Sequence, residues 1–419
     1  MTASPEVLLR SLFEAAVTAA DPMRCLPALL PPRPERRRLV IGAGKAAARM
    51  AEAVEQTWGP CEGLVITRDG YERPCRGIEI VSAAHPVPDV RGREATRRML
   101  DLLEGLGEDD AVLTLISGGA SALLVAPAGR VTLEEKRAIN AALLASGAPI
   151  EAMNTVRKHL SAVKGGRLAA AAWPARMTAL VISDVPGDEL AAIASGPTVA
   201  DRSTPAEARA ILDRHGIAVP TSVAELLDGP SGGIAPDDAR LARCETRLVA
   251  APSQSLAAAA AVGRRAGCRV EILGDAIEGE ARDVAAEQAR LARARQAALR
   301  PGDAPLLLLS GGECTVTRRG EGSGGPNAEF ALALALALRE QPGIDAIACD
   351  TDGVDGAAEV AGALVGPRTL ERARRAGRSP EAALAANDAH GFFATVGGQV
   401  VTGPTLTNVN DFRAILVRA

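Results

Sequence analysis

Aromatic side chains are scarce in this sequence, since they make up only 2% of the 419 residues. Proteins that hold single-stranded nucleic acid stack its bases on aromatic side chains, and this chain has little material for such a surface. The formal net charge is −4, and Lys and Arg are scattered among Asp and Glu rather than gathered in one basic run. We therefore expect no nucleic-acid partner.

Long apolar runs are also missing, because no stretch approaches the ~18 apolar residues that a membrane-spanning helix needs. The N-terminal segment carries Glu6, Arg10 and Glu14 at helical spacing, which is typical of an amphipathic surface helix and not of a signal peptide. The seven cysteines form no C-x-x-C pair, so a zinc or redox motif is not indicated. These absences predict a soluble cytoplasmic protein without a membrane partner, and they leave a homodimer open.

Short apolar runs alternate with Ala-rich amphipathic segments over most of the chain. This alternation is typical of an α/β protein with largely parallel sheets, whose strands are buried on both faces. The Gly- and Pro-rich loop at 227–242 is the best candidate for a boundary, which predicts domains at 1–236 and 237–419. The expected strands lie in RRLVIGAG, GLVIT, IEIVSA, AVLTLIS, TALVISD, RLVAAPS, CRVEIL, PLLLLSGGE and DAIACDTDG.

Two of the expected strands end in the same three residues, Ser-Gly-Gly. One copy is Ser117, Gly118 and Gly119, and the other is Ser310, Gly311 and Gly312, followed by Glu313. Glycines after a buried strand let backbone N–H groups approach an anion, although a tight turn has the same signature. Two copies favour anion binding over the turn.

The segment GAGKAA follows the first expected strand and precedes a helix. Gly42 and Gly44 resemble the dinucleotide fingerprint G-x-G-x-x-G/A in position, and Arg68 and Asp69 after the next strand are candidates to complete it. No Walker loop, G-x-x-x-x-G-K-[ST], occurs in the chain. Lys45 is the unusual residue here, because its ammonium group is suited to hold a carboxylate or phosphate. The alternative is a surface lysine in the first helical turn.

A helical segment with two cations begins near residue 154. Asn154, Arg157, Lys158 and Ser161 share one helical face by their spacing, and Lys164 follows in the same segment. Such a face suits an acidic ligand, although an ordinary solvated face has the same pattern. His159 lies between apolar neighbours, which favours a packed histidine over a catalytic base.

Four aspartates follow expected strands and are candidates for Mg²⁺ ligands or a general base: Asp184, Asp350, Asp352 and Asp355. The segment DTDGVDG breaks the EF-hand order, so magnesium held by few carboxylates and substrate phosphates fits better. The alternative is that each aspartate caps a turn or a helix. The Gly-rich segment with Gly324, Gly325 and Asn327 precedes the helix AEFALALALALRE, which again is an anion-binding arrangement.

Taken together, the motifs resemble those of the glycerate 2-kinases of the MOFRL type, whose relatives are often labelled hydroxypyruvate reductases of tartrate degradation. The resemblance covers roughly residues 10 to 417. The motifs that carry it are GAGKAA, HPVPD, LISGGASALL, NTVRKHLSAVKGGRLA, SDVPGDELAAIASGPTVAD, SGGECTVT, GGPNAEFALALAL, DTDGVDGAAEVAGA and TGPTLTNVND.

This resemblance implies transfer of the ATP γ-phosphoryl group to the 2-hydroxyl of D-glycerate with Mg²⁺, mainly by positioning and charge neutralisation. It also implies a Rossmann-like N-terminal domain and a MOFRL-type C-terminal α/β domain around a deep cleft. Lys45 matches a lysine at the reacting phosphate, with Asp184 and Asp352 as the catalytic carboxylates. The implied substrate residues are Ser117, Gly118, Gly119, Ser121, Asn154, Arg157 and Lys164. The implied nucleotide residues are Gly42, Gly44, Ser310, Gly311, Gly312, Glu313, Gly324, Gly325 and Asn327.

The chain departs from the family pattern in the second glycine loop. That loop commonly reads G-R-G-G-R-N, whereas Ser323 and Pro326 stand at the two arginine positions here. Two other readings remain open at this stage. One is an NAD(P)H-dependent hydroxypyruvate reductase, which rests on the GAGKAA fingerprint, and the other is a metabolite-binding protein without catalysis.

Overall fold

The computed structural model describes residues 4–229 and 233–419, and these form two compact units. The N-terminal unit contains Cys25–Ser183 and Asp188–Val249. The C-terminal unit contains the segment ending at Arg24, Asp184–Gly187 and Ala250–Ala419. This division differs from the predicted boundary at 236/237, because the first helix packs with the C-terminal unit and the strand before Ala250 completes the N-terminal sheet. Residues 230–232 of the predicted boundary loop lie outside the described residues.

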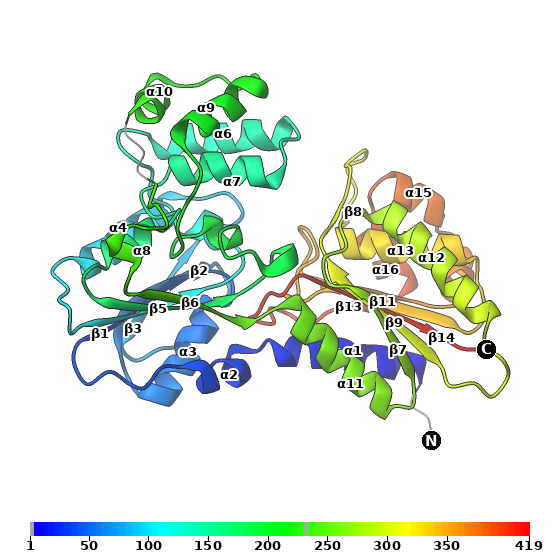
Figure 1. Cartoon of the computed structure of the whole chain (residues 1–419). Coiled ribbons are helices and arrows are strands. Elements are labelled where there is room, and N and C mark those ends of the chain that lie inside the picture. Colours follow the sequence, from blue (N-terminus) through cyan, green and yellow to red (C-terminus); the bar gives the residue numbers. More distant parts are fainter. Residues whose placement is uncertain (1–3, 230–232) are drawn as a thin grey trace. The chain divides into compact units, whose positions relative to one another are not determined.

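The N-terminal unit is built on a six-stranded sheet with the order β3-β2-β1-β4-β5-β6 (Figure 1). The pairs β1–β2, β2–β3, β1–β4 and β4–β5 are all parallel, so the predicted parallel sheet is confirmed here. This order is that of dinucleotide-binding folds, in which the chain changes direction between β1 and β4. The strands are β1 (Arg38–Ala43), β2 (Glu62–Arg68), β3 (Ile78–Ala83), β4 (Ala111–Ile116), β5 (Arg176–Ile182) and β6 (Cys244–Ala250).

Two helices pack on the N-terminal sheet because their small and apolar residues recur on one face. The helix α3 (Ala47–Trp58) contacts β1, β2 and β4, and α4 (Val90–Leu103) contacts β2 and β3. Alanines bury most of one side of α3, which allows a close approach to the strands. A separate apolar core joins four helices beyond this sheet, namely α6 (Leu133–Ala145), α7 (Ile150–His159), α9 (Pro205–Arg214) and α10 (Thr221–Asp228).

The C-terminal unit holds a mixed sheet with the order β13-β12-β11-β14-β9-β7. Only β7 and β9 pair in parallel, whereas β14 runs antiparallel to both β9 and β11. The prediction of a largely parallel sheet is therefore wrong for this unit. The strands are β7 (Arg269–Gly274), β9 (Leu306–Gly312), β11 (Ile344–Asp350), β12 (Gly362–Val365), β13 (Gln399–Val400) and β14 (Asp411–Val417).

The strand β14 was not among the expected strands, because polar residues interrupt its apolar pattern. Asp411 and Arg413 form a buried ion pair with an N–O distance of 2.6 Å, although every residue of this strand is buried. Charged side chains are rarely buried unless they are paired, so the pattern DFRAILV does not indicate a central strand. The position of β14 between β9 and β11 makes most of this sheet antiparallel.

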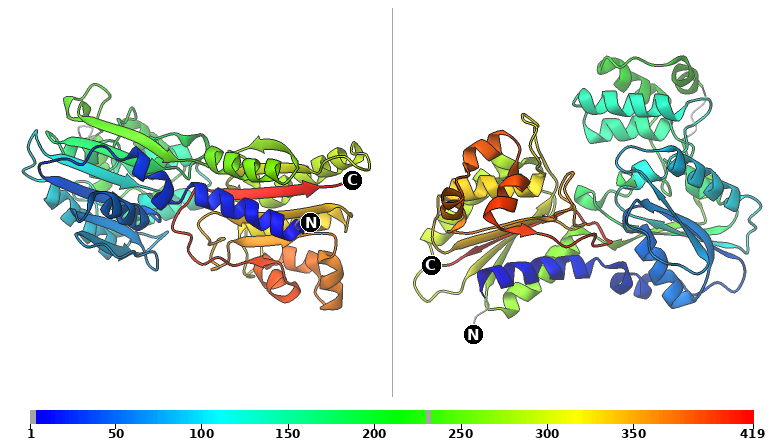
Figure 2. Two further views of the ribbon diagram at one scale, coloured as in Figure 1. Left: turned by 90° about the horizontal axis from the view of Figure 1, so that it is seen from below. Right: turned by 180° about the vertical axis from the view of Figure 1, so that it is seen from behind.

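Alternate residues of the C-terminal strands enter two different cores. Leu306, Leu308 and Ile415 belong to one core with α12 (Ala281–Ala297) and α13 (Pro326–Leu338). Leu307, Leu309 and Leu416 belong to the other, with α1 (Pro5–Ala19) and α11 (Pro252–Arg265). Figure 2 shows α1 and α11 together on one face of the sheet. Because the side chains of a strand alternate between faces, this sheet is covered by helices on both sides.

The remaining elements are short. They are α2 (Pro22–Cys25), η1 (Pro27–Leu29), α5 (Ala120–Leu123), α8 (Arg167–Ala171), η2 (Pro186–Asp188), η3 (Ile193–Ser195), η4 (Ala239–Leu241), β8 (Gly279–Glu280), β10 (Cys314–Thr315), α14 (Thr369–Arg375), α15 (Pro380–Ala385) and α16 (Ala389–Val396). Within the described residues, no helix is long and apolar enough to span a membrane.

The second Ser-Gly-Gly copy lies inside β9 rather than after it. Ser310, Gly311 and Gly312 pair with Arg413, Phe412 and Asp411 of β14. The Ser310 hydroxyl accepts a hydrogen bond from Gln288 Nε2 at 3.1 Å. The expected pair of equivalent anion-binding loops is therefore not formed, and the second copy serves the sheet.

We predict that Gly312→Ala is strongly destabilising. The φ of Gly312 is +112°, and a Cβ there would lie 2.2 Å from the backbone nitrogen of Ile277. A control is Gly267→Ala, where φ is +83° but no atom lies within 4 Å of the added Cβ. The control should lower the free energy of unfolding by roughly 1–2 kcal/mol, the cost of the left-handed backbone alone. Urea titration should show a clearly larger loss for Gly312→Ala, and equal losses would contradict this packing.

Candidate active site

The first glycine loop and the first Ser-Gly-Gly loop meet at the carboxyl ends of β1 and β4. The Ala46 N–H donates to Ser117 Oγ at 2.9 Å, and the Lys45 N–H donates to the Gly118 carbonyl at 2.8 Å. The Gly44 N–H donates to the Ile66 carbonyl at 3.1 Å. Open α/β sheets bind ligands at this edge, beside the pair of strands where the chain changes direction. The structure thus brings together the residues predicted from two separate motifs.

Close approach of the neighbouring strand accounts for both glycines of the GAGKAA segment. A Cβ on Gly42 would lie 2.3 Å from the Leu115 carbonyl oxygen, and one on Gly44 would lie 2.1 Å from Ser117 Oγ. The N–H groups of Gly44 through Ala47 all donate to groups of the protein itself. In a dinucleotide-binding loop such N–H groups face the pyrophosphate. This loop therefore lacks the donors with which a Rossmann fingerprint holds a nicotinamide cofactor.

The side chain of Lys45 lies beside Gly119 instead. A Cβ on Gly119 would lie 3.2 Å from Lys45 Cγ and 3.0 Å from His85 Nε2. Gly119 has a φ of +80°, so glycine suits both the backbone and the space at this position. Lys45 and His85 are both half-buried. A lysine and a histidine side chain therefore lie beside Gly119 at the β1–β4 edge.

In a second cluster of the same unit, Ser195 links several of the predicted substrate residues through hydrogen bonds. Ser121 Oγ lies 3.1 Å from Ser195 Oγ, and the Ser195 hydroxyl donates to Asn154 Oδ1 at 3.3 Å. Arg157 also donates to Asn154 Oδ1, at 3.4 Å. The structure therefore connects Ser121, Asn154 and Arg157 in one hydrogen-bonded group. Ser195 is fully buried, with a φ of +60° that is uncommon for a residue other than glycine.

Two lysines are buried around this group. Lys164 Nζ donates to the Ala194 carbonyl at 3.1 Å, next to Ser195. Lys136 Nζ donates to the Leu160 carbonyl at 3.0 Å, at the carboxyl end of α7. Burial, together with the nearby Arg157 and Arg167, lowers the pKa of Lys136 to about 7. The pKa of Lys164 is lowered well below its usual value, first by burial and then by Lys136 and Arg157.

This cluster carries more positive than negative charge. Asp201 forms an ion pair with Lys158 at 3.4 Å, and its carboxylate lies 3.8 Å from His159 Nε2, a ring whose pKa is lowered by burial. In the described part of the chain, no carboxylate forms an ion pair with Lys136, Arg157 or Lys164. Buried cations without counter-charges are costly, and an anionic ligand would relieve that cost. The geometry therefore supports an acidic substrate at the group formed by Ser121, Asn154, Arg157, Lys164 and Ser195.

In the C-terminal unit, the segment 405–410 joins the Asp184 loop to the loop at Asp352. Asn408 Nδ2 donates to Asp184 Oδ2 at 3.3 Å, and Asn410 Nδ2 donates to the Asp184 carbonyl at 3.0 Å. The Thr405 N–H donates to the Asp352 carbonyl at 3.1 Å. The Asp184 side chain is half-buried, whereas Asp352 is fully buried and accepts from the Val354 N–H at 2.8 Å. Asp184 is therefore the more accessible of the two predicted catalytic carboxylates.

The carboxylate of Asp355 occupies the predicted anion site at the start of α13. Its two oxygens accept the N–H groups of Asn327 at 2.9 Å and Ala328 at 2.8 Å. His390 Nε2 lies 3.1 Å from Oδ2 of the same carboxylate. A Cβ on Gly325 would lie 2.5 Å from Asp355 Oδ1, so the side chain fills this space. The N–H groups at this helix start are thus engaged by a carboxylate of the protein, and a role of Asp355 or Asn327 toward a metal or nucleotide stays a prediction.

The four aspartates predicted to bind metal do not form one cluster. Among the described residues, no group of three or more His, Cys, Asp or Glu side chains is arranged to hold a metal ion. Asp350 Oδ1 accepts the Asp352 N–H at 2.9 Å, which is a turn contact. Which of Asp184, Asp350, Asp352 and Asp355 bind Mg²⁺ therefore stays a prediction. Mg²⁺ often takes only one or two protein carboxylates, so Asp184 remains a candidate ligand.

Two further predicted nucleotide positions lie near this region without a shown role. Glu313 is exposed after β9, and Gly324 packs against Asn387, whose carbonyl oxygen would lie 2.7 Å from a Cβ on Gly324. Ser323, at one of the two arginine positions of the family pattern, donates its N–H to Asp388 Oδ1 at 3.2 Å. The nucleotide contacts of this unit stay a prediction.

Comparison with known proteins assigns the chain to a family. Residues 8–228 match a family described as a domain of unknown function, DUF4147, and residues 306–411 match the MOFRL family. The chain is 38% identical to the D-glycerate 2-kinase of Thermotoga maritima, over 97% of this chain and 98% of that protein. It belongs to the MOFRL-type glycerate 2-kinases.

Other members of the family carry two kinds of name. An Agrobacterium vitis protein that bears the name of a hydroxypyruvate reductase is 52% identical, over 99% of this chain and 95% of that protein. A crystal structure of glycerate kinase from Thermotoga maritima matches with a TM-score of 0.88 at 36% identity, covering 99% of this chain and all of that one. The two-domain α/β fold expected from the resemblance is thereby confirmed.

Three residues of the candidate site in this glycerate 2-kinase family member were not expected from sequence. His85 lies in the motif HPVPD and Ser195 lies in IASGPTVAD, so both were within motifs that supported the resemblance. Neither was singled out, because each touches its partners only after distant loops meet. Lys136 had no signal at all, since it lies in an ordinary amphipathic helix with glutamates and alanines around it.

The helix-capping role of Asp355 predicts a stability defect in Asp355→Asn. The amide would present an NH₂ group to one of two buried N–H donors, so the free energy of unfolding should fall by about 3 kcal/mol. Asp303→Asn is the control, because Asp303 accepts a backbone N–H in an exposed turn and should change stability by under ~1 kcal/mol. Denaturant titration measures both. An unchanged stability of Asp355→Asn would contradict the capping role.

The buried Lys136 predicts a particular dependence of stability on pH. Its pKa is about 7 in the folded protein and 10.5 in an unperturbed lysine, so between these values the unfolded chain binds a proton that the folded protein lacks. The free energy of unfolding should therefore rise with pH across this window, by at most about 1.4 kcal/mol per pH unit. Lys136→Met should lose this rise. Parallel stability curves for the two proteins would contradict the shift.

Proposed function

We propose that this protein transfers the γ-phosphoryl group of Mg·ATP to the 2-hydroxyl of D-glycerate, which gives 2-phosphoglycerate and ADP. One structural observation supports phosphoryl transfer independently of the names that the relatives bear. The N–H groups of Gly44 through Ala47 all donate to acceptors within the protein, while Lys45 lies beside Gly119 at the edge where open α/β sheets bind ligands. A cationic side chain suits a transferring phosphoryl group, whereas a nicotinamide pyrophosphate needs the free backbone donors.

The glycerate carboxylate would bind at the buried cationic group. Arg157 and Lys164 supply the charge, and Ser121, Asn154 and Ser195 supply hydrogen-bonding partners around it. The lowered pKa of Lys164 reflects burial among like charges, and a carboxylate placed there would favour the protonated amine. Substrate binding at a pH near neutral should thus be accompanied by proton uptake. This arrangement holds the acid end and leaves the hydroxyl groups free to face the phosphate.

The reaction moves one proton and one phosphoryl group. The glycerate 2-hydroxyl oxygen forms the new bond to the γ-phosphorus, the bond from that phosphorus to the β,γ-bridging oxygen breaks, and ADP leaves. We assign Lys45 to the charge on the transferring group. We assign Asp184 to accept the hydroxyl proton or to hold the metal, because its carboxylate is half-buried and oriented by Asn408.

The residues present fit Mg²⁺ only in part. Asp184 is one accessible carboxylate, and Asp352 and Asp355 are engaged in a turn and a helix cap. Mg²⁺ completes its shell with water and substrate phosphates when few carboxylates are present, and it would neutralise charge on the polyphosphate. The proposal therefore needs a single protein carboxylate at the metal and no dedicated metal cage.

A hydroxypyruvate reductase is the second candidate, because a relative at 52% identity bears that name. Glycerate and hydroxypyruvate are both carboxylates of similar size, so the cationic group serves either one. The difference lies at the GAGKAA loop, whose bonded N–H groups favour the kinase.

The deciding experiment follows phosphorus NMR of purified protein with Mg·ATP and D-glycerate. Formation of 2-phosphoglycerate is expected. Formation of 3-phosphoglycerate would retain the phosphoryl transfer and overturn the position of attack. Oxidation of NADH or NADPH by hydroxypyruvate, without any phosphorylated product, would overturn the proposal in favour of the reductase.

We predict that Lys45→Ala lowers kcat by about 100-fold or more, since it removes the cation placed at the developing charge. Lys45→Arg should retain part of the activity. Thermal melting should be nearly unchanged, because the side chain is only half-buried and its backbone bonds to Gly118 remain. Turnover of Lys45→Ala at the rate of the unaltered protein would remove Lys45 from the mechanism.

A further inference from the structure

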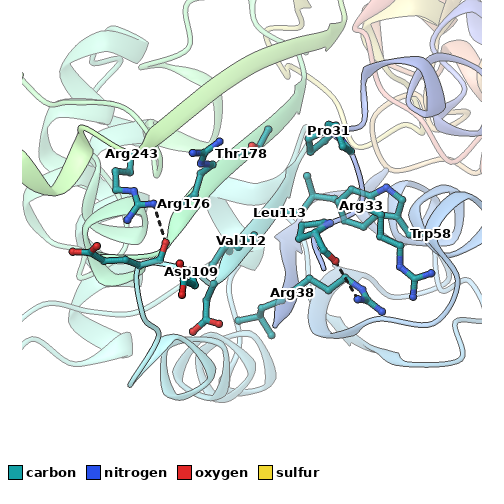
Figure 3. A pocket seen from close by; sticks show the side chains of 16 residues that line it. Pro31, Arg33, Arg38, Trp58, Asp109, Val112, Leu113, Arg176, Thr178 and Arg243 are labelled. Carbon is teal, nitrogen blue, oxygen red and sulfur yellow. Dashed lines mark hydrogen bonds between the residues drawn. The ribbon is translucent and has the colours of Figure 1, made fainter. Parts of the chain in front are cut away.

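A cavity of about 450 Å³ opens in the N-terminal unit at the edge of the sheet opposite to the candidate active site (Figure 3). It lies where β1, β4 and β5 begin, since Arg38, Ala111 and Arg176 are the first residues of these strands and line it. The glycine loops described above follow the carboxyl ends of β1 and β4. Six residues of strand separate the two edges, which is roughly 20 Å at the usual rise per residue.

Four arginines line this cavity, and among the described residues none of them has an ionic partner. Figure 3 shows Arg33 and Arg38 on one side and Arg176 and Arg243 on the other. In the described residues, no carboxylate forms an ion pair with any of the four. Arg243 donates to the carbonyls of Pro174 and Glu108, and Arg38 donates to that of Pro34. The buried Nε of Arg38 has no hydrogen-bond acceptor.

The neighbouring arginines, in contrast, do have ionic partners. Arg36 and Arg37 come from the same segment but lie outside the cavity lining, and they pair with Asp109 at 3.0 Å and Glu62 at 2.9 Å. Three acidic residues, Glu108, Asp109 and Asp110, also line the cavity, and in the described residues none of them forms an ion pair with the four arginines. Asp109 is engaged by Arg36, and Asp110 Oδ2 accepts the Gly107 N–H at 2.8 Å. Glu108 is the one rim carboxylate that no described group engages.

Apart from Thr178, the rest of the lining is apolar. The Trp58 side chain forms part of the wall although the residue is only 5% exposed, and prolines from the segment before β1 line another part. Cavities of this volume hold molecules of the size of a cofactor or metabolite, with apolar walls for the body and a few charged groups for orientation. Guanidinium groups recognise phosphate with paired hydrogen bonds.

We propose that this cavity binds a phosphomonoester that carries a ring, with the phosphate at the arginines and the ring against Trp58. A dianionic phosphate matches several guanidinium groups better than a single carboxylate does, because it offers three terminal oxygens and more charge. The site is separate from the cationic group that holds the substrate, since its residues are at the beginnings of the strands and those of the active site follow their ends.

The test uses the fluorescence of Trp58. The chain contains two tryptophans, and Trp173 does not line the cavity, so Trp173→Phe leaves Trp58 as the only tryptophan. We expect AMP and phenyl phosphate to change this fluorescence in a saturable way. Arg33→Ala and Arg176→Ala, both exposed and without structural bonds from their side chains, should weaken binding by about tenfold each.

Matched variants separate this site from others. Arg37→Ala removes a nearby arginine outside the cavity and should leave the affinity unchanged. Lys45→Ala should also leave it unchanged, whereas a loss there would assign the AMP signal to the active site and overturn the proposal. An absent fluorescence change at millimolar AMP and phenyl phosphate, with folding confirmed by circular dichroism, would overturn it too. Equal binding of adenosine and AMP would reject the phosphate as the recognised group.

Discussion

A buried charge needs a counter-charge or hydrogen-bond partners, and much of this structure depends on how that need is met. In the C-terminal unit, Asp355 and Asp411 are buried, and both are satisfied within the protein: Asp355 by the start of α13 and Asp411 by Arg413 and Asn327. In the N-terminal unit, Arg157, Lys136 and Lys164 are largely buried and lack a carboxylate partner in the described residues. The first arrangement stabilises a fold, and the second is the basis for the proposed anionic ligand.

The same criterion separates the two Ser-Gly-Gly segments. Ser117 follows β4 and receives the Ala46 N–H, so it ties the GAGKAA loop to the substrate loop at the ligand-binding edge. Ser310 lies within β9 between two strands, and its hydroxyl is engaged by a helix glutamine. The two Ser-Gly-Gly segments thus have different roles, because one follows a strand of a parallel sheet and the other lies within a strand of a mixed sheet.

Much of the N-terminal unit could be predicted from sequence. Its parallel strands are apolar over their whole length, and helical periodicity marks the helices between them. The C-terminal sheet was predicted less well, since β14 contains a buried ion pair that interrupts its apolar pattern. For the site, motifs indicated Lys45, Ser121, Asn154 and Arg157. They gave no indication of Lys136, whose significance comes only from the cations that pack around it.

The sequence by itself determined the α/β class, the GAGKAA loop and the first Ser-Gly-Gly loop at strand ends, and the basic character of the segment at 154–167, because these follow from local pattern and composition. The tertiary structure alone decided which carboxylates are accessible. Asp355, for example, accepts hydrogen bonds from the N–H groups at the start of α13, which is far from it in sequence. It also decided that the loop before α3 has no free backbone donors from Gly44 to Ala47. Hydrogen-bond partners are set by which distant segments meet, and no local pattern encodes that.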